Sequence, residues 1–75
     1  MDEFLQSVSA IARLIKQRAI DTMGPWPREL ELLVFCVGSE WKCGLSPATQ
    51  HVDIEYREGV LRIARDLQET VRVEQ

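Results

Sequence analysis

The stretch that decides the fold is E-L-E-L-L-V-F-C-V-G-S-E-W-K-C-G-L, residues 29–45. β-Branched and aromatic side chains run through it, and these suit the pleated, half-buried surface of a β-strand. Gly38 and Ser39 form a two-residue turn, because glycine adopts the positive φ that the first central position of a type II′ turn requires. The stretch therefore predicts an antiparallel β-hairpin, in which such a turn places Val34 opposite Cys43.

Both faces of the first predicted strand are apolar along most of its length. The face with the even-numbered residues is apolar throughout, whereas the other face begins with two glutamates and continues with Leu33, Phe35 and Val37. A hairpin with one face in water keeps polar residues on that face. A two-stranded sheet is also marginal alone and has two unpaired edges. We therefore expect this second face to be covered, and we favour a second copy of the protein over a helix or loop of the same chain.

Length and composition predict one α+β domain, residues 1–75. A single core in a chain of this size gives about 3–5 kcal/mol of net stability. The hydrophobic content of 45% argues against disorder, and self-association would bury the surplus. Nine Lys and Arg against twelve Asp and Glu give a net charge of −3. Because an acidic protein repels phosphate backbones, nucleic-acid binding would need a local basic patch.

Two features predict a cytoplasmic protein with no membrane partner. The longest apolar run, residues 32–37, is too short to cross a bilayer. The first residues, Met1-Asp2-Glu3-Phe4, are acidic where a signal peptide is basic. The two cysteines are too few for a disulfide framework, so we expect them as thiols.

A first helix is predicted from Asp2 to about Met23, because apolar residues recur there at steps of three and four. Gly24 ends this helix, and the following Pro25-Trp26-Pro27 prevents its continuation. The segment is a rigid connector. We expect Trp26 to fold back over one end of the core, with a role as a binding anchor as the alternative.

The segment 51–57 fits two structures. It alternates polar and apolar residues like a half-buried strand, yet Val52, Tyr56 and Val60 also begin a continuous helical stripe. We favour a helix that starts at Asp53, whose side chain can accept hydrogen bonds from the first turn. The predicted fold is then helix, antiparallel hairpin, helix (αββα), with both helices on one face of the sheet. The alternative is αβββα, with a third strand at 51–56.

No group of residues predicts an active site, a metal or a cofactor. Cys36, Cys43 and His51 are spaced unlike the ligands of a zinc site. A two-residue turn makes the cysteines diagonal neighbours, whereas a four-residue loop would place them opposite each other, where a disulfide becomes conceivable. We expect buried, inert thiols. The glycines are isolated, so no phosphate-binding loop can be drawn, and we expect the protein not to be an enzyme.

The function that we favour is a non-enzymatic interaction or regulatory module, assembled as a homodimer and open to a heterologous protein partner. Its predicted contact residues are Trp26, Leu33, Phe35, Val37 and Trp41. The alternative is a nucleic-acid-binding module. Its contacts would come from a basic patch on the first helix and the hairpin, formed by Arg13, Lys16, Arg18 and Lys42.

Overall fold

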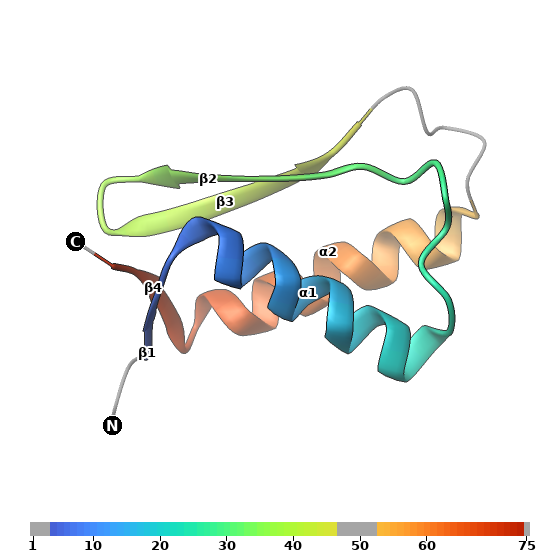
Figure 1. Cartoon of the computed structure of the whole chain (residues 1–75), viewed down its shortest axis with the longest axis horizontal. Helices are drawn as coiled ribbons and strands as arrows, with labels where there is room; N and C mark the ends of the chain where they lie inside the picture. Colours follow the sequence, from blue (N-terminus) through green and yellow to red (C-terminus); the bar gives the residue numbers. More distant parts are fainter. Residues whose placement is uncertain (1–3, 47–52, 75) are drawn as a thin grey trace.

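The computed structural model describes residues 4–46 and 53–74. The elements are, in chain order, β1 (Phe4–Gln6), α1 (Val8–Met23), β2 (Leu32–Val37), β3 (Glu40–Leu45), α2 (Ile54–Gln68) and β4 (Val71–Val73). The β2–β3 hairpin covers one side of the two helices, while β1 and β4 lie at one end of the molecule (Figure 1). The predicted α+β fold, with the order helix, hairpin, helix, is confirmed. The β1–β4 pair is an addition to it.

The hairpin has the predicted turn and register. Val37 pairs with Glu40 across Gly38 and Ser39, and Val34 pairs with Cys43. Gly38 has a φ of 67°, and no residue other than glycine in the described part of the chain has a positive φ. This combination is that of a type II′ turn. The four-residue loop considered from the sequence is therefore wrong.

Helix α1 begins at Val8, six residues later than predicted. The Ser7 backbone is extended, and its side-chain oxygen accepts a hydrogen bond of 3.1 Å from the amide of Ala10, so Ser7 is the N-cap. Residues 4–6 form β1 instead of helix, and residues 2 and 3, with which the predicted helix begins, lie outside the described residues. At the other end Gly24 closes the helix as predicted, with a φ of 101° and an N–H that donates to the carbonyl of Ile20 at 3.1 Å.

Helix α2 begins at Ile54, with Asp53 as its N-cap. The Asp53 carboxylate accepts from the amide of Glu55 at 2.9 Å, which confirms the helical alternative. The alternative, a third strand at 51–56, is wrong over residues 53–56, and residues 51 and 52 lie outside the described chain. Gly59 lies inside this helix, and the sulfur of Met23 occupies the place that a Cβ atom at position 59 would take. The end of the Met23 side chain therefore packs against the α2 backbone at this position.

Strands β1 and β4 are parallel and bring the two ends of the described chain together. Phe4 pairs with Val71 and Gln6 with Val73, and the amide of Glu74 donates to the carbonyl of Gln6 at 2.9 Å. The amide of Val73 also donates to the carbonyl of Ser39 at 3.2 Å, so β4 holds the tip of the hairpin in place.

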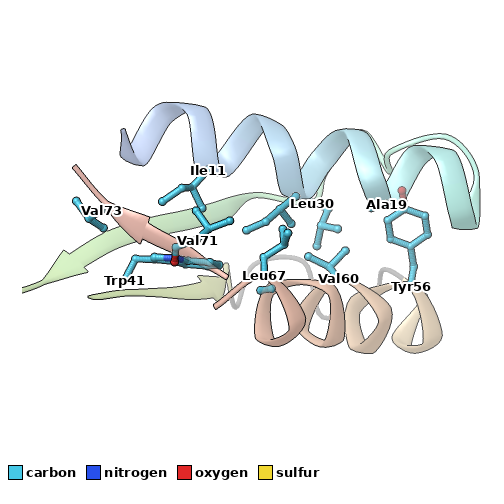
Figure 2. Close-up of a cluster of buried hydrophobic side chains, with 11 residues drawn as sticks. Ile11, Ala19, Leu30, Trp41, Tyr56, Val60, Leu67, Val71 and Val73 are labelled. Carbon is cyan, nitrogen blue, oxygen red and sulfur yellow. The ribbon is translucent and has the colours of Figure 1, made fainter. Parts of the chain in front are cut away.

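The core lies between the inner face of the hairpin and the two helices (Figure 2). Trp41 is its largest fully buried side chain. The core residues are Ile11, Ile15, Ala19, Leu30, Trp41, Tyr56, Val60, Ala64, Leu67, Val71 and Val73. One apolar stripe from each helix, one face of the hairpin and both valines of β4 thus meet in a single cluster.

Candidate interaction surface

The face of the hairpin turned away from the helices, called here the outer face, carries an exposed apolar row. Its β2 residues are Leu33, Phe35 and Val37, which remain 63%, 46% and 52% exposed. They alternate with Leu32 and Val34, which pack against the core, as the period of a strand requires. The helices therefore cover one face of β2 and leave the other uncovered within the described residues.

The β3 half of the outer face is polar. Val37 pairs with Glu40, Phe35 with Lys42 and Leu33 with Gly44. Lys42 and Glu40 are exposed. The outer face thus combines one apolar row with one charged row, and the two rows are a single strand spacing apart.

A hollow interrupts the charged row at Gly44, which presents no side chain opposite Leu33. Its volume is about 350 Å³, and its walls are Glu31, Leu32, Leu33, Gly44, Leu45 and Ser46. A Cβ atom added to Gly44 would meet no atom within 4 Å. The hollow is therefore open above Gly44.

Trp26 folds back over one end of the core, as expected from the sequence. Its ring is half-buried and meets the ring of Tyr56 edge to face, with 5.9 Å between centroids. Its indole N–H donates to the carbonyl of Leu30 at 2.8 Å. The ammonium of Lys16 lies 5.3 Å from the ring centroid. The Tyr56 hydroxyl donates to the carbonyl of Gly24 at 2.9 Å, so the connector is fastened to both helices.

Trp41 was predicted as a contact residue, but it lies in the core and is only 2% exposed. It pairs with Cys36, and this pair points to the inner face of the hairpin. Its indole N–H donates to the carbonyl of Val71 at 2.9 Å. The sequence alone predicts this orientation, because successive residues of β3 alternate between the two faces and Trp41 therefore points away from the face of Lys42.

The basic residues of the alternative prediction do not form one patch with the hairpin. Arg13, Lys16 and Arg18 are exposed on α1, which packs beneath β2. Lys42 projects from the outer face, on the other side of the sheet. The predicted combination of helix and hairpin contacts is therefore split between two sides of the molecule.

The cysteines occupy different environments. Both are free thiols; Cys43 is half-buried, whereas Cys36 is exposed, so the expectation of a buried thiol is wrong for Cys36. Burial raises the pKa of the Cys43 thiol, which keeps it protonated at neutral pH. A protonated thiol is a poor nucleophile. Burial thus works against activation of the Cys43 thiol.

A larger hollow, of about 440 Å³, lies between β3 and α2. Cys43 and Arg57 are among its wall residues, and the Arg57 Nε is buried without a hydrogen-bond partner. Across residues 4–46 and 53–74, no three or more His, Cys, Asp or Glu side chains come together as a metal site. His51 lies outside the described residues.

No helix within the described residues is both long and apolar enough to cross a membrane. No protein-family model, curated protein or solved structure matches the chain.

Proposed function

We propose that this protein is a non-enzymatic, cytoplasmic interaction module that works as a homodimer joined through the outer face of its hairpin. The observation that carries the proposal is the row Leu33, Phe35 and Val37, three large apolar side chains that are each about half exposed or more. Contiguous exposed apolar residues with a polar border mark interaction sites on soluble proteins. The polar border here is the charged row of β3.

A second copy is the partner that best suits this surface. The hairpin has two strands and one covered face, and a sheet of this size gains stability when its other face is packed as well. A two-fold pair of outer faces would bury both apolar rows at once, because an isologous interface uses the same patch on each subunit. The aromatic ring of Phe35 lies in the middle of the row, where binding energy concentrates.

The proposal is tested by measuring molecular mass in solution, by sedimentation over a range of protein concentrations. We expect a reversible dimer, because packing the two outer faces together removes the exposed apolar row of each copy from water. The variant Phe35→Ala is expected to weaken dimerisation by at least about tenfold, the effect of losing an interface aromatic.

The matched control is Leu61→Ala. Leu61 is a large, exposed apolar residue on α2, so its truncation removes a similar surface away from the outer face. This variant should dimerise like the wild type. A wild-type protein that stays monomeric at every concentration would refute the proposal, and so would an equal loss from both variants.

A further inference from the structure

Gly44 is a glycine that its own chain does not require. The glycines with positive φ in the described chain are Gly24 and Gly38, so the backbone at Gly44 is open to any residue. A Cβ atom there would touch nothing within 4 Å, so packing within the chain does not exclude a side chain either. Glycine inside a strand weakens the strand and often marks a place where another molecule approaches closely.

We propose that two copies pack outer face to outer face about a two-fold axis, with Phe35 of each copy seated in the hollow above Gly44 of the other. This arrangement rests on the proposed homodimer and specifies how it is built. The ring is the largest side chain on the outer face, and the hollow is about 350 Å³. A single two-fold axis makes both contacts, if it lies in the interface midway between the ring and the hollow of one copy. Rotation about this axis places each ring over the hollow of the other copy.

Charge complementarity supports a second copy as the occupant. Lys42 is the cross-strand neighbour of Phe35, and Glu31 lies on the wall of the hollow. Neither side chain forms an ion pair with another described residue. When the ring enters the hollow, the long side chain of Lys42 comes within reach of Glu31 of the partner subunit. The same contact forms twice in the dimer, once on each side of the axis.

The first test fills the hollow with Gly44→Val. Valine suits a strand, and the Cβ atom that it adds meets no other atom of the single chain within 4 Å. The variant should therefore remain folded, with a far-ultraviolet circular dichroism spectrum like that of the wild type. Its dimerisation should weaken by at least about tenfold, because the ring of Phe35 has no place to enter. A folded Gly44→Val protein that dimerises like the wild type would overturn the arrangement.

The second test exchanges the charges. Lys42→Glu alone and Glu31→Lys alone should each weaken dimerisation, because each places like charges at both contacts. The double variant should dimerise within a few-fold of the wild type. If the double variant is no better than the single ones, the proposed contact between Lys42 and Glu31 is wrong.

The third test mixes two defective proteins. Phe35→Ala lacks the ring and keeps the hollow, whereas Gly44→Val lacks the hollow and keeps the ring. Their mixture should form a heterodimer, since one complete ring and hollow contact is restored, whereas each protein alone should be largely monomeric. Absence of the heterodimer would refute the seating of Phe35 above Gly44.

The outcomes separate this arrangement from the proposed function. Suppose that the wild type is a dimer and that Phe35→Ala weakens it, but that Gly44→Val and the charge reversals leave dimerisation unchanged and the mixture forms no heterodimer. The outer face is then the interface, and the proposed arrangement is wrong. If the wild type is monomeric at every concentration, both proposals fail together.

Discussion

Trp41 connects three elements through one residue. Its ring fills the core from β3, its indole N–H donates to the carbonyl of Val71 in β4, and its own carbonyl accepts from the side-chain amide of Gln68 at 2.8 Å in α2. Buried polar groups are satisfied in native proteins, and a buried indole N–H needs such a partner. Trp41 therefore fixes the position of the last strand relative to the hairpin.

We expect Trp41→Phe to lower the free energy of unfolding by about 2–4 kcal/mol, because it leaves a cavity and removes the hydrogen bond that the Val71 carbonyl accepts from the indole. Urea denaturation measures this loss. Trp26→Phe is the matched control, since the half-buried Trp26 also donates one hydrogen bond to a carbonyl. It should lower stability by less. Equal losses would show that Trp41 is not the more important of the two residues.

The sequence predicted which side chains share a face wherever successive residues alternate between the two faces of a strand. It predicted that Val34 faces Cys43 and that Leu33, Phe35 and Val37 share one face, and the structure agrees. It predicted Trp41 as a contact residue, although the alternation along the strand places Trp41 on the same face as Cys43 and Leu45, and the structure buries it. The hollow has a weak sequence signal, because the absence of a side chain at Gly44 gains meaning only when its neighbours are placed around it.

The elements differ in how much local sequence specifies them. The hairpin and α2 each carry a residue that marks a boundary, Gly38 in the turn and Asp53 at the N-cap, and both were predicted. Strands β1 and β4 have three residues each, too few to show a period. Their partners are at opposite ends of the chain, so no local pattern could have predicted the pairing. Phe4 and Leu5 instead fit the apolar stripe of α1, which extended the predicted helix.

The N-cap of α1 can be tested by removing its side-chain hydrogen bond. Ser7→Ala removes the oxygen that accepts from Ala10, and we expect a loss of about 1 kcal/mol in the free energy of unfolding. Ser9→Ala is the control, because Ser9 is exposed inside the same helix and alanine is a better helix former. That change should be neutral or slightly stabilising. Chemical denaturation of both variants checks the result, and a Ser7→Ala protein as stable as Ser9→Ala would contradict the assigned cap.

For the molecule as a whole, a half-buried thiol and a buried phenol predict how stability depends on pH. Burial raises the pKa of both Cys43 and Tyr56 in the folded protein. Above about pH 8.5 for a thiol and about pH 10 for a phenol, the unfolded chain releases protons that the folded chain still holds. Stability contributed by these groups is therefore fully present below those values and is lost as pH rises.

We accordingly expect the free energy of unfolding, measured by urea denaturation under reducing conditions, to fall between about pH 8.5 and pH 11. Cys43→Ala should make the first part of this decline shallower, and Tyr56→Phe should do the same for the last part. Tyr56→Phe also removes the hydrogen bond to Gly24, so its stability at neutral pH is the reference for its own curve. If the decline of the unfolding free energy with pH is unchanged in both variants, its cause is the titration of other groups.

Tension along the chain would meet β1 and β4 first. The two strands are parallel, so a force that pulls Phe4 backward and Val73 forward acts on them in opposite directions along a common axis. Their hydrogen bonds are then loaded together in shear, whereas the strands of a hairpin pulled from its open end separate one bond at a time. Two short strands thus form a mechanical clamp across the ends of the described chain. The helices and the hairpin are loaded only after β1 and β4 have separated.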